Sequence, residues 1–365
     1  MMLQTLRLKN FRNFKNFSLS LSGKVNVITG PNGVGKTNLL EAIFLLAKGK
    51  SFRTTSNGYL IGVPSGNSPS TGIAFIEGLV RGDNELETTL GMSLSNGSKK
   101  YLVNGKDSSY QDFRPRFHAV IFSPRDLDII IGDPSLRRAF LDELNGDGSG
   151  EYVNISTDYR HVLRQRNQLL SRGKFSAAEL DYWDAQLVDL GSAIIAERKR
   201  AVDNLNQRLD AGHLFLEYFP SPRIIKEELE QVDDWTGGKV GELFRHKLKE
   251  IVEREKEIGF TLIGPQRDEL KFFGLVDSSG VKRDLAVFGS RGQQRMAVVH
   301  LKRAQLELLR AKLEECPVLL LDDVFSELDE HCREILLPIF DYQQTVVTAV
   351  SLPKGIEASM SVELK

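Results

Sequence analysis

The chain has little cysteine and no long apolar run, and both absences narrow what it can be. Its 365 residues include two cysteines, Cys316 and Cys332, which are too few for a disulfide framework and fit a reduced compartment. No hydrophobic stretch approaches the length of a membrane helix, and the first residues do not have the pattern of a signal peptide. We therefore expect a cytoplasmic protein without a membrane partner.

The chain also lacks an excess of charge of either sign. Its formal net charge is −1 at pH 7, with 27% of residues charged and 41% hydrophobic. This composition is that of an ordinary globular protein, and the length allows more than one lobe. Any surface that binds nucleic acid must therefore be a local patch.

Residues 30–38 form the most informative motif, because they predict a site for a nucleoside triphosphate. Gly30, Gly35, Lys36 and Thr37 match G-x-x-x-x-G-K-[ST], between an apolar run typical of a buried strand and a segment with helical periodicity. In such a loop backbone amides surround the phosphates, the lysine reaches the β- and γ-phosphates, and the threonine ligates Mg²⁺. A glycine turn without a ligand is the less favoured interpretation. The predicted contacts are Gly30, Pro31, Asn32, Gly33, Val34, Gly35, Lys36, Thr37 and Asn38.

An acidic pair follows a second buried strand late in the chain. Residues 318–321 are apolar, and Asp322 and Asp323 come directly after them. We expect Asp322 to hold Mg²⁺ through water, and Asp323 to orient or deprotonate the attacking water. The candidate catalytic residues are thus Lys36, Asp322 and Asp323, with ATP and Mg²⁺ as cofactors. Alone the acidic pair is a weak signal, because many buried strands end in aspartate at a turn.

Two further segments flank this strand in the order found in ABC-type ATPases. One opens a helix with Ser-Arg-Gly-Gln from Ser290, and the other reads Ser-Glu-Leu-Asp from Ser326. The Ser290 hydroxyl and the Gly292 amide would form a second anion site. We expect it to contact the γ-phosphate held by another copy, in an ATP-dependent head-to-tail dimer. The alternative is a helix cap without a ligand. The predicted contacts are Ser290, Gly292, Gln293, Gln294 and Asp329.

The middle of the chain has helical periodicity. Residues 152–172 and a longer segment beginning at Ser176 and Glu179, a predicted capping box, are separated by Gly173, which favours an antiparallel helical hairpin. Strand-like pieces between 71 and 103 predict an antiparallel sheet region, and residues 54–70 are expected to form a surface loop. We predict an α/β fold, with an ATPase head containing a mixed sheet over 1–145 and 256–365 and an inserted helical lobe over 146–255.

The first helix of this lobe carries the predicted DNA surface. Residues 156–175 contain five basic side chains and one acidic side chain, Asp158. Contacts of such residues with phosphates give salt-dependent binding that is largely independent of sequence. A solvated face, or arginines paired with neighbouring carboxylates, explains the same charges equally well. The candidate DNA contacts are Arg160, Arg164, Arg166 and Arg172.

Taken together, the motifs resemble those of the RecF family of bacterial recombination proteins, relatives of the SMC-type ATPases. The matching segments are residues 8–14, 38–43, 49–53, 122–127, 137–142, 163–167, 183–187, 264–268, 289–295 and 320–328. The resemblance implies an SMC-like head with a short helical arm, which binds DNA and hydrolyses ATP slowly with stimulation by DNA. It also implies a role in loading RecA at gaps and stalled forks, with RecR and RecO as partners. By position, it places Arg12 and Asn13 against the nucleotide.

Two positions depart from the family pattern. Gln266 stands where Gly-Pro-x-Arg-Asp usually has a histidine, and Thr348, Ala349 and Val350 replace a threonine-rich run, so we expect hydrolysis to be slow. Two other functions stay open. One is a nucleotide-dependent scaffold whose hydrolysis is incidental. The other is the ATPase subunit of a transporter, for which no adaptor loop is visible.

Overall fold

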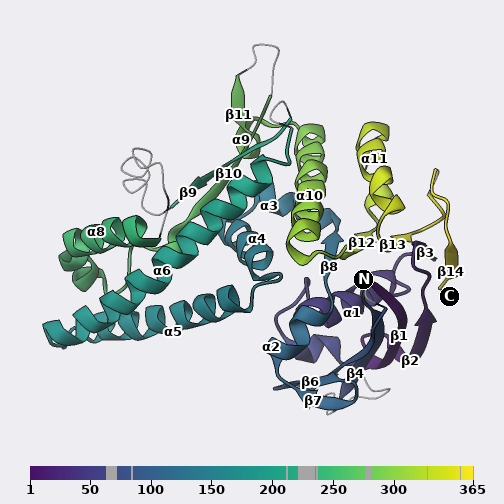
Figure 1. Ribbon diagram of the computed structural model, residues 1–365, viewed down its shortest axis with the longest axis horizontal. Helices are drawn as coiled ribbons and strands as arrows, with labels where there is room; N and C mark the ends of the chain where they lie inside the picture. The colour runs from purple at the N-terminus through teal and green to yellow at the C-terminus, as the bar shows by residue number, and fades with distance from the viewer. Residues whose placement is uncertain are drawn as a thin grey trace. The chain divides into compact units, whose positions relative to one another are not determined.

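The computed structural model describes residues 1–62, 72–83, 85–210, 213–220, 235, 237–275, 281–326, 328–353 and 355–364. The chain forms two compact units (Figure 1). Unit 1 is Met1–Asp126 with Leu306–Lys365, and unit 2 is Leu127–Gln305. Unit 2 is wider than the lobe expected over 146–255, because it also contains a three-stranded sheet and most of the helix that follows it. The assignment of these units as domains stays a proposal.

The first sheet of unit 1 is antiparallel. Its order is β2 (Phe14–Ser20), β1 (Met2–Phe11), β4 (Ala74–Arg81), β5 (Glu87–Leu94), β6 (Lys99–Val103) and β7 (Lys106–Ser108). Side chains alternate between the buried and the solvated face in β4, as a half-buried strand requires. The antiparallel region expected between 71 and 103 is confirmed. The short helix η1 (Asn57–Leu60) occupies part of the loop expected over 54–70, and residues 63–70 lie outside the described residues.

The second sheet of unit 1 is parallel and draws strands from both ends of the chain. Its order is β14 (Met360–Glu363), β3 (Val25–Thr29), β13 (Thr345–Ala349), β12 (Val318–Asp322) and β8 (Ala119–Phe122). Residues of β8, β12 and β13 are buried throughout, because a parallel sheet is covered on both faces. The carboxyl ends of β3, β12 and β13 therefore lie at one edge.

Helices complete unit 1. Helix α1 (Lys36–Lys48) contacts strands of both sheets, and its leucines and Ile43 are buried in the same core as Leu3, Leu6 and Leu320. The remaining helical segments are α2 (Tyr110–Phe113), η2 (Arg114–Arg116), η3 (Pro124–Asp126), η5 (Val324–Ser326), α11 (Glu330–Leu336) and η6 (Leu337–Asp341). The N-terminus of α1 is thus fixed at the carboxyl edge of the parallel sheet.

Unit 2 contains the predicted helical hairpin. Helix α5 (Gly150–Arg172) ends at Gly173 in the left-handed conformation, and α6 (Ala177–Asn206) begins with the predicted capping box of Ser176 and Glu179. With α8 (Gly237–Ile258), these helices enclose a core that includes Tyr159, Leu187 and Phe244 (Figure 1).

Unit 2 also contains a small antiparallel sheet of β11 (Lys282–Asp284), β10 (Glu269–Leu275) and β9 (Phe215–Phe219). The other elements of unit 2 are α3 (Leu127–Ile131), α4 (Pro134–Gly146), η4 (Pro265–Arg267), α9 (Leu285–Phe288) and residues 291–305 of α10, a helix that spans Arg291–Leu313.

Candidate nucleotide site

The loop between β3 and α1 has the backbone that a phosphate site needs. Gly30, Gly33 and Gly35 have φ of 149°, 85° and 112°, which side chains disfavour. A Cβ at Gly30 would lie 2.6 Å from the carbonyl oxygen of Leu364, and one at Gly35 would lie 2.5 Å from the Asn13 side chain. Helix α1 begins without a side-chain cap, so the amides of its first turn are left for an anion.

Lys36 is held in the centre of this loop. Its Nζ donates to the carbonyl oxygens of Gly30 at 2.7 Å and Pro31 at 3.0 Å, and the residue is 7% exposed. The ammonium group is therefore already directed into the concave side of the loop. A phosphate bound there would replace carbonyl dipoles with a full negative charge, which strengthens the interaction.

Three oxygen-bearing side chains meet at the edge of the parallel sheet. The hydroxyls of Thr37 and Thr348 donate to Asp322 Oδ1 at 2.8 Å and 3.0 Å. Burial raises the pKa of Asp322, and these two hydrogen bonds act to lower it. A hydroxyl and a carboxylate are hard oxygen ligands, and Mg²⁺ takes few such protein ligands and fills its shell with water and phosphate oxygens. Thr37 and Asp322 therefore fit the predicted Mg²⁺ site.

Over the residues that the structure describes, no group of three or more His, Cys, Asp or Glu side chains is placed to hold a metal ion.

Asp323 follows Asp322 with φ of 54°, a left-handed conformation that is uncommon outside glycine, asparagine and aspartate. Its amide donates to both the carbonyl and the hydroxyl oxygen of Thr348 at 3.1 Å. The half-buried side chain of Asp323 thus projects from a fixed backbone next to Asp322. Such strain is typical of functional sites.

Glu41 connects the segments around the loop and was missed in the sequence. It lies within α1, is fully buried, and accepts two hydrogen bonds from Arg12 at 2.8 Å and 2.7 Å. Ser51 donates to the same carboxylate at 2.5 Å, and Arg53 lies 3.6 Å from it. Arg12 itself has φ of 52° in the tight turn between β1 and β2. One carboxylate therefore holds the turn and the segment after α1 against the helix.

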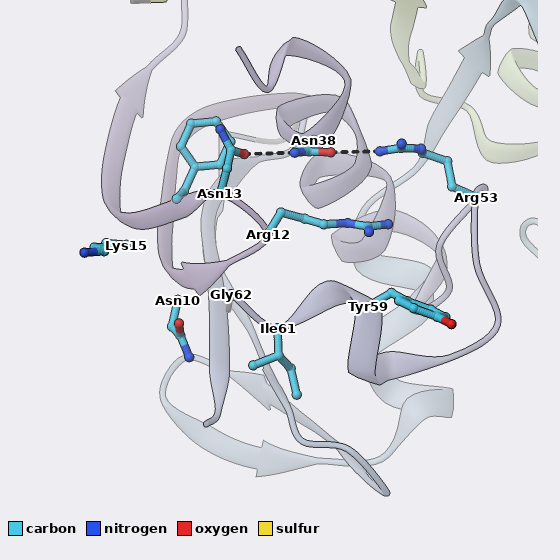
Figure 2. Close-up of a pocket in the computed structure, with 10 residues that line it drawn as sticks. Asn10, Arg12, Asn13, Lys15, Asn38, Arg53, Tyr59, Ile61 and Gly62 are labelled. Atoms are coloured by element: carbon cyan, nitrogen blue, oxygen red, sulfur yellow. Dashed lines mark hydrogen bonds between the residues drawn. The ribbon is translucent and has the colours of Figure 1, made fainter. Parts of the chain in front are cut away.

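The predicted nucleotide residue Asn13 belongs to a chain of amide contacts (Figure 2). Asn13 accepts from Asn38 at 2.8 Å and donates to the carbonyl oxygen of Val34 at 2.8 Å. Asn38 in turn accepts from Arg53 at 2.8 Å. Asn38, at the end of the motif, is thus hydrogen-bonded both to Asn13 in the β1–β2 turn and to Arg53.

A cavity of about 530 Å³ opens beside these residues (Figure 2). It begins at Asn13 and Asn38, next to the first turn of α1, and extends to η1. The residues that line it are Asn10, Arg12, Asn13, Phe14, Lys15, Asn38, Arg53, Tyr59, Ile61 and Gly62. The predicted residues Arg12, Asn13 and Asn38 are thereby brought together at one cavity of unit 1.

The segment from Ser290 to Gln294 lies in unit 2 and forms a capping box. Ser290 Oγ accepts from the amide of Gln293 at 3.3 Å, and Gln293 Oε1 accepts from the amide of Ser290 at 2.8 Å. Ser290 and Gly292 are exposed. The Ser290 hydroxyl hydrogen and the amides of Arg291 and Gly292, in the first turn of α10, are still able to donate to an anion.

Two other predicted contacts are used within the fold. Gln294 is 5% exposed and donates to the carbonyl oxygen of Leu285 at 2.8 Å, so its expected contact with nucleotide is not supported: the side chain is buried against α9. Asp329 is exposed and caps α11 by accepting from the amide of Cys332 at 2.8 Å.

The prediction that Arg166 contacts DNA is wrong. Its side chain is 0% exposed and donates to Asp184 at 2.6 Å, Glu255 at 2.7 Å and Thr261 at 2.8 Å. The alternative of pairing with neighbouring carboxylates therefore holds for this arginine. The other candidates on α5, Arg160, Arg164 and Arg172, are exposed.

The two departures from the family pattern have clear structural roles. Gln266 accepts from the Tyr159 hydroxyl and donates to the carbonyl oxygen of Ile263 at 2.8 Å, so it anchors η4 to α5. Thr348 binds Asp322, whereas Ala349 is buried and Val350 is exposed.

None of the helices in the described part of the chain is both long and apolar enough to cross a bilayer.

Comparisons with known proteins extend over almost the whole chain. Residues 2–361 match the family model of the RecF/RecN/SMC N-terminal domain. The protein called DNA replication and repair protein RecF of Bacillus cytotoxicus is 36% identical over 373 residues, which cover 98% of this chain and 94% of that protein. The protein of the same name in Bacillus mycoides is 35% identical over 385 residues, covering 100% and 96%.

Solved structures agree with these relatives. The recombination mediator protein RecF of the RecFOR pathway, solved with ATP, matches with a TM-score of 0.87 and 29% identity, over 99% of this chain and 95% of that one. An Smc head domain from Pyrococcus furiosus matches in fold, with a TM-score of 0.50, 14% identity and coverage of 96% and 89%. The predicted α/β fold of an ABC/SMC-type head is confirmed.

Proposed function

The chain belongs to the RecF family, and we propose that it is an ATPase of recombinational DNA repair that binds ATP at the phosphate loop of unit 1. The observation that carries the proposal is the cluster of Lys36, Thr37 and Asp322 at the carboxyl edge of the parallel sheet. Two further observations support it: Thr37 and Thr348 donate to Asp322 at the same edge, and a cavity of about 530 Å³ opens beside the loop.

Different residues of unit 1 bind the phosphates of ATP, bind Mg²⁺ and activate water for hydrolysis. The loop amides and Lys36 bind the phosphates, and Thr37 and Asp322 hold Mg²⁺, which when bound neutralises charge between the β- and γ-phosphates. Asp323 orients the attacking water and takes its proton. Arg12, Asn13 and Asn38 line the cavity on the nucleoside side of the loop.

The segment at the start of α10 supports an ATP-dependent dimer. A nucleotide needs one phosphate loop, so the additional donors at Ser290, Arg291 and Gly292 are available to the γ-phosphate held by a second copy. The Ser290–Gln293 capping box fixes the hydroxyl before the second copy arrives. Asp329, exposed at the start of α11, is a further contact of this dimer.

The proposed dimer acts as a clamp on DNA. The exposed arginines of α5 supply phosphate contacts, and hydrolysis, slow and stimulated by DNA, reopens the clamp. RecR and RecO are the proposed partners, and RecA loading at gaps and stalled forks is the proposed outcome. These finer points rest on the resemblance to the RecF family.

Calorimetry and light scattering test the proposal together. Wild type should bind ATP with Mg²⁺ and change from monomer to dimer. Lys36→Met should lose most ATP affinity, because the remaining amides are weaker than a charged donor. Ser290→Arg should bind ATP like wild type and stay monomeric, since the new side chain blocks only the second anion site.

Lys106→Met is the matched control, because Lys106 is an exposed lysine of the same unit. It should behave as wild type in both measurements. Absence of ATP binding by wild type would overturn the nucleotide site. A wild type that binds ATP but stays monomeric with DNA present would overturn the clamp and favour a nucleotide-dependent scaffold.

A further inference from the structure

The cavity beside the phosphate loop has two chemically different ends. Asn13 and Asn38 line the end next to α1, and they are occupied with each other and with Val34 and Arg53. Tyr59 and Ile61 line the end formed by η1 and the residues after it. A ligand that fills the cavity therefore meets amide groups at one end and an aromatic ring at the other.

Tyr59 is exposed although its surroundings are firmly anchored. The neighbouring Leu60 and Ile61 are 1% and 3% exposed, whereas Tyr59 is 71% exposed. The backbone is tied to the end of β1 and to the turn after it, because the Arg12 amide donates to the Leu60 carbonyl at 2.9 Å and the Gly62 amide donates to the Asn10 carbonyl at 2.7 Å. The ring thus extends from a fixed support, so its exposure is not explained by a loose loop.

Two other large side chains of the cavity, Phe14 and Arg12, make contacts within the protein. All the lining residues are described, and two of them, Phe14 and Tyr59, are aromatic. Phe14 packs against Phe17 with ring centroids 4.8 Å apart and against the hydrophobic core. Arg12 donates from Nε and Nη2 to the two carboxylate oxygens of Glu41, so one edge of its guanidinium is bound there. Tyr59 is therefore the aromatic lining residue whose ring is left to a ligand.

The orientation of a bound nucleotide follows from the position of the phosphate loop and Lys36. The terminal phosphate lies toward Lys36 and Asp322, so the α-phosphate lies at the first turn of α1, near Asn38. The base then enters the cavity and reaches the end at Tyr59. We propose, on the basis of the proposed function, that Tyr59 stacks on the base of the bound nucleotide and favours purines over pyrimidines. A purine offers the larger ring face, and an aromatic side chain gains more from it.

Calorimetry with ATP, UTP and inorganic tripolyphosphate, each with Mg²⁺, tests this role. Tyr59→Ala should weaken ATP binding by roughly 5- to 100-fold, as expected for one base–aromatic stack, and should weaken UTP less. Tripolyphosphate has no base, so its affinity should be unchanged. Tyr59→Phe keeps the ring and should bind ATP within about twofold of wild type.

Two controls separate the stacking role from other effects. Tyr182→Ala removes a tyrosine of α6 in unit 2 that is 59% exposed, and it should bind all three ligands as wild type does. Lys36→Met should weaken ATP and tripolyphosphate alike, because it acts on the phosphates.

The outcomes distinguish this inference from the proposed function. Unchanged ATP affinity in Tyr59→Ala, with normal binding by wild type, would overturn the stacking role alone. Equal losses of ATP and tripolyphosphate in Tyr59→Ala would also overturn it, because they indicate a disturbed loop. If wild type binds neither ligand, the nucleotide site and the stacking role both fail.

Discussion

Asp323 combines a proposed catalytic carboxylate with a left-handed backbone of φ 54°. Asparagine tolerates this conformation and has nearly the same shape, but it cannot take a proton. We therefore predict that Asp323→Asn lowers ATP turnover by about 10²-fold or more, while ATP affinity and thermal stability stay close to wild type. Phosphate release at saturating ATP measures the turnover.

A second variant at this position checks that the backbone is not the cause. Asp323→Gly relieves the strain and should be at least as stable as Asp323→Asn, with the same loss of turnover. Turnover of Asp323→Asn within a few-fold of wild type would contradict the proposed role of the carboxylate.

The backbone of the phosphate loop could be predicted because its residues are local in the sequence. Gly30, Gly35 and Lys36 lie within one loop, and the pattern specifies their geometry. Glu41 could not be identified in this way. It stands in a helical run of leucines, and its partners Arg12 and Ser51 reach it only after the sheet and helix have packed. A single acidic residue on an otherwise apolar helix face is the signal that would have found it.

At the scale of the element, Arg166 binds the three helices of the lobe together. It is on α5, and its partners Asp184 and Glu255 are on α6 and α8. Removing one partner of a buried ion pair leaves uncompensated charges, so Arg166→Met should lower the free energy of unfolding by about 3–5 kcal/mol. Urea denaturation followed by the fluorescence of Trp183, adjacent to Asp184 in α6, measures the change.

The loss of unfolding free energy in Arg166→Met should also depend on pH. Burial raises the pKa of both Asp184 and Glu255, against the lowering effect of Arg166, and the loss of the arginine raises them further. A carboxyl with a raised folded pKa contributes stability at acid pH that is lost as the pH rises through that pKa. The deficit of Arg166→Met should therefore be smaller near pH 5 than at pH 8.

Arg160→Met is the control for both measurements, because Arg160 is an exposed arginine of the same helix. It should change the free energy of unfolding by less than about 0.5 kcal/mol at either pH. An equal effect of the two variants would mean that the buried pairs do not stabilise the lobe.

The helical hairpin was predictable because its signals are local: a terminal Gly173 and a capping box at Ser176. Which arginine of α5 faces inward was not predictable from charge alone, because Arg166 shares its segment with exposed arginines. Its partner Glu255 lies on α8, far along the chain. Unit 2 extends beyond the expected lobe for a similar reason, since β9 and β10 pair across a long separation in the sequence.

At the scale of the whole molecule, the parallel sheet explains why the two ends of the chain form one unit. Strand β3 pairs with β13 and β14, and β12 pairs with β8. The order of motifs along the chain predicted this assembly, since a phosphate loop and an acidic strand must meet at one sheet edge to share Mg²⁺. The proposed dimer and clamp involve the whole chain, so their tests require the intact protein.

DNA binding is a property of the whole molecule, and the exposed arginines of α5, Arg160, Arg164 and Arg172, predict it. Arg164 and Arg172 are exposed on α5, and their spacing of eight residues places them about 12 Å apart along the helix axis and about 80° apart around it. If both contact phosphates, Arg164→Ala with Arg172→Ala should weaken duplex binding at every sequence tested. The slope of log affinity against log salt should fall by about 2, because each lost phosphate contact releases about one counterion fewer.

Arg200→Ala is the matched control, since Arg200 is an exposed arginine of α6 that pairs with Glu197 on its own helix. It should leave both affinity and salt slope as in wild type. Fluorescence anisotropy with labelled duplex between about 50 and 200 mM salt covers the range in which such slopes are resolved. Equal slopes for the double variant and wild type would mean that Arg164 and Arg172 do not contact DNA, because a phosphate contact cannot be lost without a change in counterion release.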